Sequence, residues 1–315
     1  MKILGTGSAL PKKVVTNDML SEFLDTSDEW IVPRTGIKSR HVISDEQIED
    51  LACEAAGKAL EMSGVNPTEL DYFVCSTVVS EYVTPSLSCV ISEKMGLTCP
   101  CIDINCACPG FIYALDIVEA QYKAGRIKHA LIICAEEPTR MTSWEDRSTC
   151  VLFGDGAGAV VLGEGDSVKG ISLHSQPAID KILQRQVLCP TPYITKEESG
   201  TPLQMKGRDV FKFAVTASTT DVTELLDKLG MTKDDVDYYM VHQANLRIID
   251  GIKKYLEEPD GKFPTNISDH GNSSSASCPI LLDEYNRKGL FKKGDILCFS
   301  AFGAGLLSAV AVIEW

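Results

Sequence analysis

The stretch EMSGVNPTELDYFVCS, residues 61–76, is repeated in altered form as DKLGMTKDDVDYYMVH, residues 227–242. At this offset Gly64 falls on Gly230, and the Asp-Tyr pair that follows each glycine falls on its counterpart. A glycine after a helical pattern marks a helix stop, and the apolar run beyond it is typical of a strand. The two stretches therefore predict the same helix, turn and strand at two places in the chain.

A second pair of segments repeats at nearly the same offset. YKAGRIKHALIICAE, residues 122–136, lines up with NRKGLFKKGDILCFS, residues 286–300, and places Cys134 on Cys298. Two similar pairs in the same order indicate an ancient duplication rather than chance.

Strands and helices alternate along the whole chain. DLACEAAGKALEMSG, residues 50–64, carries apolar residues at helical spacing, and short runs rich in β-branched residues alternate with such stretches. This alternation predicts an α/β protein with mainly parallel sheets, in two halves of residues 1–165 and 166–315. The expected strands lie at 71–79, 129–137, 157–164, 237–242 and 295–302.

The composition is typical of a soluble globular protein. The 315 residues are 44% hydrophobic and carry a net charge of -14, which argues against nucleic acid as a partner. No apolar run reaches the roughly 18 residues of a membrane span, and the first residues do not read as an export signal. We therefore expect a cytoplasmic protein with no membrane partner, whose twelve cysteines are free thiols rather than a disulfide framework.

Cys106 and Cys108 in DINCACPGF, residues 103–111, could be metal ligands, a redox couple, packing residues, or a nucleophile beside a bystander. Their C-x-C spacing differs from the C-x2-C pairs of zinc sites. Proline is favoured at the first helical position, so Pro109 predicts Cys108 at the N-cap and Cys106 at the end of a strand. Because a helix N-terminus stabilises an anion, Cys108 is the better placed thiolate. Two buried cysteines at a turn remain the alternative on this stretch alone.

The repeat relates two distant residues to this cysteine pair. At the same offsets Cys108 falls on Asn272 in DHGNSSSASC, and Ser76 falls on His242 in MVHQANLRII. If the halves pack around a pseudo-twofold axis, Cys108, Asn272 and His242 face one pocket. A histidine at a strand end can serve as acid, base or donor, and an amide can donate to an oxyanion. Taken singly, each of these two residues is more often structural: a satisfied histidine at His242 and a turn residue at Asn272.

Two glycine clusters could be mistaken for phosphate loops. FGDGAGAVVL, residues 153–162, precedes a strand instead of joining a strand to a helix, and AFGAG, residues 301–305, has no helix after it. Both are predicted to be tight turns where the backbone approaches a pocket.

Together these stretches resemble the β-ketoacyl-acyl carrier protein synthases III, a family of the thiolase-like superfamily. The resemblance implies a duplicated five-layer αβαβα fold with two central mixed sheets, which agrees with the internal repeat. The motifs that follow the family's order and spacing are GTGSALPKKVVTN, DTSDEWIVPRTGIKSRH, CACPGF, FGDGAGAVVL, VHQANLRII, HGNSSSAS and AFGAG.

The resemblance also implies the chemistry. Cys108 would attack the thioester of an acyl-CoA, and the acyl-enzyme would then meet malonyl-acyl carrier protein. His242 and Asn272 would stabilise the enolate formed on decarboxylation, whose carbon attacks the acyl-cysteine to give a 3-oxoacyl product. This order implies ping-pong kinetics, with acyl-CoA as a substrate and no bound cofactor.

An oxyanion hole for the acyl step is implied at the backbone N–H groups of Cys108 and Ala304. Relatives often have glycine in place of Ala304 and a small residue in place of Pro109, so both are departures. Alanine keeps the donor in place if its φ is negative.

The resemblance places Trp30 and Arg147 around the adenine of CoA and Arg34 at its phosphates. An indole and a guanidinium can sandwich the face of a base, so the assignment is physically sensible. The further channel positions that it implies are Thr26, Gly207, Phe211 and Asn245.

Acyl carrier protein is acidic, so its docking on an acidic enzyme needs a local basic patch. Arg247, Lys253 and Lys254 follow His242 on one expected helix, and Lys212 lies on another helical stretch. We expect these four residues to surround the mouth of the substrate tunnel.

The segment EYVTPSLSC, residues 81–89, matches one that in relatives reaches across a homodimer interface to close the acyl pocket. Members that use short primers often have an aromatic residue at the position of Thr84. Threonine there predicts room for a branched or longer acyl group.

Two rival interpretations remain. An acyltransferase or condensing enzyme of specialised metabolism would keep the acyl-cysteine and change the acceptor, although the presence of both His242 and Asn272 favours decarboxylative condensation. A metal or redox protein built on the C-x-C pairs would leave the repeat and the glycine turns unexplained.

Overall fold

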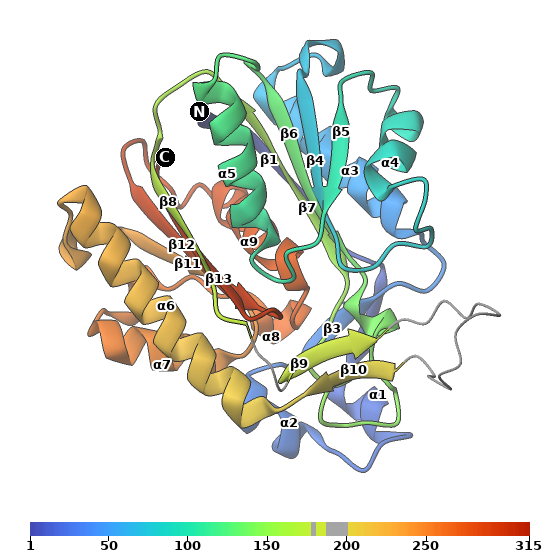
Figure 1. The fold of residues 1–315 in the computed structure, drawn as a ribbon. Coiled ribbons are helices and arrows are strands. Elements are labelled where there is room, and N and C mark those ends of the chain that lie inside the picture. Colours follow the sequence, from blue (N-terminus) through green and yellow to red (C-terminus); the bar gives the residue numbers. More distant parts are fainter. Residues whose placement is uncertain (178–180, 187–200) are drawn as a thin grey trace.

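Two mixed β-sheets lie at the centre of the molecule (Figure 1) in the computed structural model, which describes residues 1–177, 181–186 and 201–315. The first sheet has the strand order β1-β7-β6-β4-β5, with β4 parallel to both neighbours. The second has the order β11-β12-β13-β8, with β11 parallel to β12. The strands are β1 (Lys2–Ala9), β7 (Gly156–Gly163), β6 (Ala130–Glu136), β4 (Tyr72–Ser76), β5 (Cys101–Ile104), β11 (Tyr238–Val241), β12 (Ile296–Gly303), β13 (Leu307–Glu314) and β8 (Val168–Ser175).

Helices form three layers around and between these sheets (Figure 1). Helices α5 and α9 lie between the two sheets, α3 and α4 cover the outer face of the first, and α6 and α7 cover the outer face of the second. The molecule therefore has the predicted five-layer αβαβα fold. The helices are α5 (Gly110–Lys123), α9 (Ser277–Arg287), α3 (Ile48–Ser63), α4 (Leu87–Met95), α6 (Gly207–Leu229) and α7 (Leu246–Leu256).

Strand β6 shows why the strands read as continuous apolar runs. Ile132 and Cys134 pack into the core between the sheets, whereas Leu131 and Ile133 pack into the core under α3 and α4. Successive side chains of a strand point to opposite faces, and here both faces are covered by helices. All four side chains are completely buried.

The repeated segments have the same local structure. Helix α3 ends at Gly64 and α6 at Gly230, with φ of 68° and 69°, in the left-handed region that glycine enters most easily. A short 3-10 turn with a capping box follows each glycine, and then β4 or β11 begins. The two repeated sequence segments thus fold into the same helix, turn and strand.

Each half also contributes to the packing of the other. Helix α9 packs on β1 and β7, and helix α5 packs on β8 and β13. The predicted boundary at residues 165 and 166 falls between β7 and β8. The division of the chain into two domains at that point stays a prediction.

Smaller elements gather at one end of the sheets, in the lower part of Figure 1. There the β9–β10 pair lies near β3, α1 and α2. Within the described ranges no helix has the length and apolarity that crossing a bilayer requires. The remaining elements are α1 (Asn17–Ser21), α2 (Asp28–Thr35), α8 (Ile267–His270), β2 (Lys13–Thr16), β3 (Ser39–Val42), β9 (Leu183–Gln186), β10 (Thr201–Met205) and 3-10 turns at Pro67–Glu69, Pro138–Arg140, Lys233–Asp235, Asp260–Lys262 and Ser274–Ala276.

Candidate active site

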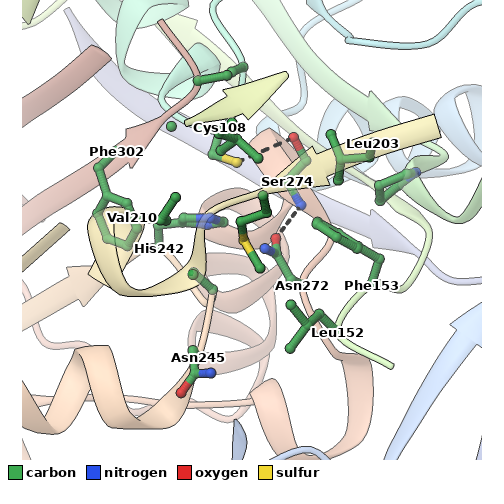
Figure 2. Close-up of a pocket in the computed structure, with 18 of the residues that line it drawn as sticks. Cys108, Leu152, Phe153, Leu203, Val210, His242, Asn245, Asn272, Ser274 and Phe302 are labelled. Carbon is green, nitrogen blue, oxygen red and sulfur yellow. Dashed lines mark hydrogen bonds between the residues drawn. The ribbon is translucent and has the colours of Figure 1, made fainter. Parts of the chain in front are cut away.

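A pocket of about 870 Å³ is lined by residues from both halves of the chain (Figure 2). The loop after β5 contributes Cys108, the end of β11 contributes His242, and the loop before α9 contributes Asn272. Apolar side chains such as Leu203 and Phe302 line it as well. The structure therefore brings together the three residues that the repeat related to one another.

Cys108 lies in a sharp turn between β5 and α5. Ala107 before it has a φ of 50°, which is uncommon for a residue with a side chain. Helix α5 begins at Gly110 with Pro109 as its N-cap, so the prediction of Pro109 as first helical residue and Cys108 as N-cap is wrong by one position. Pro109 has a ψ of 2°, outside the helical range. Cys106 lies beyond the end of β5 rather than within the strand.

Close packing of backbone holds this turn in place. A Cβ at Gly110 would lie 1.9 Å from Ser76 Oγ, so the start of α5 can approach β4 only with glycine at that position. A Cβ at Gly303 would lie 2.9 Å from the backbone nitrogen of Cys108. The AFGAG turn thus packs directly against the turn that carries the thiol.

Cys108 lines the pocket and is partly exposed as a whole residue, but its thiol is desolvated. Burial raises its pKa to about 12, and Ser274 Oγ lies 3.7 Å from Cys108 Sγ. The helix N-terminus was expected to favour a thiolate, but desolvation is the larger effect. Cys108 therefore rests as a thiol, and its proton has to leave when the sulfur reacts.

His242 follows β11 and is 1% exposed. Its backbone N–H donates to the Ser300 carbonyl at 2.8 Å, and its Nδ1 lies 2.6 Å from Ser277 Oγ. The ring packs edge-on against Phe302, with ring centroids 5.4 Å apart. Burial lowers the pKa of the imidazole to about 3, so His242 is neutral at physiological pH.

Asn272 is held by the FGDGAG turn. Its backbone N–H donates to the Leu152 carbonyl at 2.8 Å, and its carbonyl accepts from Gly154 at 3.2 Å. Its side-chain Oδ1 accepts from the Ser274 backbone N–H at 2.9 Å, an interaction that Figure 2 shows. With Oδ1 engaged, the amide Nδ2 is the end of the side chain left to donate to a ligand. Phe153 of this segment and Leu152 just before it line the pocket, as expected. Gly156 and Gly158 lie in β7, so the predicted tight turn is confined to the residues before that strand.

Gly303 and Ala304 belong to the pocket lining as well. Ala304 is not among the described residues with positive φ, so its conformation is open to any residue with a side chain. The condition under which alanine keeps the backbone donor is met.

The predicted CoA residues fall into two groups. Arg34, Gly207, Phe211 and Asn245 line the pocket, whereas Thr26, Trp30 and Arg147 lie outside the described lining. The guanidinium carbon of Arg34 lies 4.7 Å from the Trp30 ring centroid and that of Arg147 lies 5.1 Å from it. Arg34 thus connects the pocket to the indole.

The contacts of Arg147 bear on the predicted adenine site. Its guanidinium also pairs with Asp25 Oδ2 at 3.0 Å. A base stacked between Trp30 and Arg147 needs about twice the thickness of an aromatic ring, more than the present spacing leaves. Arg147 has to swing away from Trp30 before the predicted sandwich can form.

Arginines give the pocket a local positive charge on an acidic protein. Among its described lining residues, the charged side chains are Arg34, Arg185, Arg208 and Arg247. Arg185 and Arg208 escaped the sequence analysis because β9 and the start of α6 carry no motif of their own. Arg208 could have been noticed as the neighbour of Gly207.

The predicted carrier-protein patch is smaller than expected. Lys212, Arg247 and Lys254 are exposed. Lys253 is paired with Asp250 at 2.8 Å and with Asp260 at 3.0 Å, so its charge is compensated locally. Lys253 is therefore a poor member of a patch that attracts an acidic protein.

Thr84 is exposed and lies outside the described lining of this pocket. Its neighbours Tyr82 and Val83 are 54% and 97% exposed. In the single chain, the segment 81–85, which we call the arm, is thus exposed to solvent. A role for Thr84 in an acyl pocket requires a second subunit.

Two residues behind the thiol were missed from the sequence. Ser274 lines the pocket next to Cys108, and Glu136 lies completely buried behind Ser274. Ser274 stands in the loop that supplied Asn272, which was the available signal. Glu136 is the last residue of an apolar strand and is followed by Glu137, a pattern that predicts the start of a solvated loop. The local sequence therefore gives no sign that Glu136 is buried at the site.

Comparisons with known proteins find relatives that match along the whole chain. The family sequence model for 3-oxoacyl-[acyl-carrier-protein] synthase III matches residues 102–177, and the one for the C terminal part of the same synthase matches residues 226–315. The chain is 43% identical to the β-ketoacyl-[acyl-carrier-protein] synthase III of Xanthomonas euvesicatoria pv. vesicatoria (strain 85-10), over 100% of this chain and 98% of the relative.

Solved structures show the same similarity. The 3-oxoacyl-[acyl-carrier-protein] synthase III of Aquifex aeolicus VF5 has a TM-score of 0.93 and 38% identity, over 100% of this chain and 99% of that one. The priming β-ketosynthase from the R1128 polyketide biosynthetic pathway also has a TM-score of 0.93, with 34% identity over 99% of this chain and 95% of that one.

Proposed function

The chain belongs to the 3-oxoacyl-[acyl-carrier-protein] synthase III family, and on that premise we propose that Cys108, His242 and Asn272 perform its condensing reaction. As a member, the protein is an acyltransferase of the condensing type that initiates fatty acid synthesis. The observation that carries the assignment of residues is their common pocket, where a thiol faces two neutral donors.

In the first half-reaction the Cys108 sulfur attacks the thioester carbonyl of an acyl-CoA and CoA leaves. The backbone N–H groups of Cys108 and Ala304 stabilise the oxyanion of the tetrahedral intermediate. The contact between the AFGAG turn and the Cys108 turn supports this pairing of donors.

In the second half-reaction malonyl-acyl carrier protein enters the pocket and loses carbon dioxide. His242, neutral because of its burial, donates from Nε2 to the enolate oxygen, and Asn272 donates from Nδ2. The enolate carbon then attacks the acyl-cysteine and releases 3-oxoacyl-acyl carrier protein. This chemistry needs no cofactor beyond the two substrates.

The pocket arginines bind the anionic parts of the substrates. We assign Arg34, with Arg208 beside Gly207, to the phosphates of CoA, because guanidinium groups bind phosphate in bidentate fashion. Trp30 and Arg147 receive the adenine after Arg147 has moved, and Thr26, Phe211 and Asn245 border the channel.

Acyl carrier protein docks on the exposed basic residues Lys212, Arg247 and Lys254 near the pocket. A homodimer completes the site, with the arm around Thr84 reaching the partner's acyl pocket. The exposure of Val83 supports this part of the proposal, as does the edge position of β5 in its sheet. We place the protein in the cytoplasm, where both substrates occur.

Intact-protein mass spectrometry after exposure to acyl-CoAs tests the proposal. Acetyl-, isobutyryl- and hexanoyl-CoA should each be tried, because Thr84 predicts acceptance of branched or longer groups. A single acyl group should add to the wild type and to Cys106→Ala, and none to Cys108→Ala. Acylation that survives in Cys108→Ala would refute the nucleophile, and strict acceptance of acetyl-CoA would refute the prediction for Thr84.

A second candidate function is a priming ketosynthase of a specialised pathway. The similarity to the R1128 priming β-ketosynthase supports it, because that structure has the same TM-score, 0.93, as the Aquifex enzyme. Release of carbon dioxide from malonyl-acyl carrier protein of the fatty acid pathway by the acylated enzyme would favour the first function. Its absence, with acylation intact, would favour a different acceptor.

A further inference from the structure

A buried carboxyl group lies behind the nucleophile and has no part in the condensation described above. Glu136 ends β6 and is completely buried. Its Oε1 accepts from Ser275 Oγ at 2.6 Å and from Ser274 Oγ at 3.0 Å, and its Oε2 accepts from the Val78 backbone N–H at 3.0 Å. These partners are neutral hydroxyl and amide groups rather than cations.

Ser274 connects this carboxyl group to the thiol. Its Oγ lies 3.7 Å from Cys108 Sγ and 3.0 Å from Glu136 Oε1, and Figure 2 shows it next to Cys108. Ser274 is 3% exposed and has a φ of 53°, a conformation that is uncommon for a residue with a side chain and recurs at functional sites. Among the residues that the structure describes, the Ser274 hydroxyl is thus the group that contacts both the sulfur and the carboxyl.

The other polar residues of the pocket are poor acceptors for the thiol proton. Burial holds the pKa of His242 near 3, so the imidazole does not keep a proton at neutral pH. Asn272 and the backbone amides are donors. Burial raises the pKa of Glu136 to about 7, where a group can both take and return a proton under physiological conditions.

We propose that Glu136 takes up the Cys108 proton through Ser274 during acylation, an inference that rests on the proposed role of Cys108 as nucleophile. The thiol proton moves to Ser274 Oγ as the Ser274 proton moves to Glu136 Oε1. Sulfur then bonds to the thioester carbon, and the bond from that carbon to the CoA sulfur breaks. The proton returns through Ser274 to the departing CoA thiolate, which leaves as a thiol and restores the carboxylate.

None of the described ionisable groups that face Glu136 titrates near pH 7, so Glu136 is the group that does. The facing groups are the thiols of Cys75 on β4, Cys134 on its own strand and Cys108, and burial raises the pKa of all three. These thiols stay protonated across neutral pH. A pH profile with an inflection near 7 therefore reports the carboxyl group.

Alkylation of Cys108 by iodoacetamide tests the relay without CoA or carrier protein. In a Cys106→Ala background, peptide mass spectrometry would follow the rate constant of alkylation at Cys108 between about pH 5.5 and 9. We expect an inflection near pH 7, with the faster rate on the alkaline side, where Glu136 is a carboxylate. Glu136→Gln and Ser274→Ala should each abolish the inflection and lower the rate at neutral pH about 100-fold.

Asp155→Asn provides the matched control. Asp155 is completely buried and burial also raises its pKa to about 7, but it hydrogen-bonds Thr139 and Ile43 rather than Ser274. This variant should keep the inflection near pH 7. Loss of the inflection in Asp155→Asn, or its retention in either relay variant, would overturn the proposal. If Glu136→Gln fails to fold, Ser274→Ala decides, since it removes one hydroxyl group.

Single-turnover acylation separates this inference from the proposed function. With acyl-CoA as the probe, Glu136→Gln should slow acylation of Cys108 about 100-fold, while enzyme acylated by long incubation condenses with malonyl-acyl carrier protein near the wild-type rate. Equal loss in both half-reactions would sink the relay and leave the function standing. A wild type that alkylates normally but takes no acyl group would sink the function instead.

Discussion

The hydrogen bond between His242 Nδ1 and Ser277 Oγ determines which ring nitrogen of His242 carries the proton. The backbone N–H of Gln243 donates to the same oxygen at 3.4 Å. With a donor already on its oxygen, Ser277 is free to give its own proton to Nδ1, which places the imidazole proton on Nε2. That tautomer presents a donor to the pocket, as stabilisation of an enolate requires.

Ser277→Ala should therefore impair condensation more than acylation. Without the hydroxyl the proton can shift to Nδ1, and the donor at Nε2 is lost part of the time. Release of carbon dioxide from malonyl-acyl carrier protein should slow by up to about 100-fold, the cost of one donor to an oxyanion. Ser277→Thr keeps the hydroxyl and serves as the control; a slowing of acylation by the same factor in Ser277→Ala would contradict the assignment.

The burial of His242 also predicts a loss of stability in acid. Unfolded chains take up the histidine proton near pH 6.5, whereas the folded residue resists protonation until about pH 3. The unfolded state thus binds more protons between these values, and the free energy of unfolding falls as the pH drops, by about 1.4 kcal/mol per pH unit.

His242→Gln should remove this contribution. Urea unfolding at about pH 5.5 and 4.5 would show a steeper loss of stability in the wild type than in the variant, by the same amount per pH unit. Equal slopes in the two proteins would mean that His242 is protonated in the fold.

Among the elements, helix α5 depends on one contact at its first residue. Gly110→Ala would force a methyl group into Ser76 Oγ and should cost about 1–3 kcal/mol of unfolding free energy and displace Cys108. Gly57 in the middle of α3 has open space around it, so Gly57→Ala should stabilise the protein by about 0.5–1 kcal/mol. Thermal unfolding of both variants checks the pair, and a stabilised Gly110→Ala would refute the packing argument.

Helices α6 and α7 carry the charges that we assign to docking. Arg247 also lines the pocket, so its reversal would disturb both substrates. Lys212→Glu with Lys254→Glu should instead raise the KM for malonyl-acyl carrier protein, by about tenfold at low salt, and leave acylation by acyl-CoA intact. Lys228→Glu at the other end of α6 is the control. The same KM in the double variant and the wild type would move the docking site elsewhere.

The elements with a clear period were predictable from the sequence, and those without one were not. The expected helix at 50–64 is α3, and the expected strands at 129–137 and 295–302 are β6 and β12, with ends that differ by one residue, or by two at the start of α3. The β9–β10 pair lines the pocket, but its strands are only 4 and 5 residues long, too short for a period to stand out in the sequence. Its importance arises from packing, which no local pattern records.

Some residues of the candidate site could likewise be predicted from the sequence and others could not. Cys108, His242 and Asn272 were predictable because the duplication relates them and each lies at the end of an element. Glu136 was not, because its position depends on the pairing of β6 with β4 and on a serine far along the chain. The start of α5 was misjudged because proline suits the N-cap as well as the first helical residue.

At the scale of the whole molecule, the exposed arm and the open edge of β5 predict a homodimer. The chain of 34.3 kDa should sediment at twice that mass. Val83→Asp places a charge on a side chain that is 97% exposed in the single chain, so it should not disturb the fold of the subunit. It should weaken association and acylation together, whereas a wild-type monomer that acylates normally would refute the shared pocket.

The two duplicated halves of the chain supply groups of opposite kinds: a nucleophile and hydrogen-bond donors. In the proposed mechanism the Cys108 sulfur of the first half gives electrons to a carbonyl carbon, and His242 and Asn272 of the second half donate hydrogen bonds to a negatively charged oxygen of the substrate. Ser76, the counterpart of His242, donates instead to Ser275 beneath the start of α5. Two separate copies of an identical half-chain would have to present the same group on both sides of the axis. Joined in one chain, the copies were free to diverge. A thioester bound as we propose would therefore face a nucleophile on one side and hydrogen-bond donors on the other.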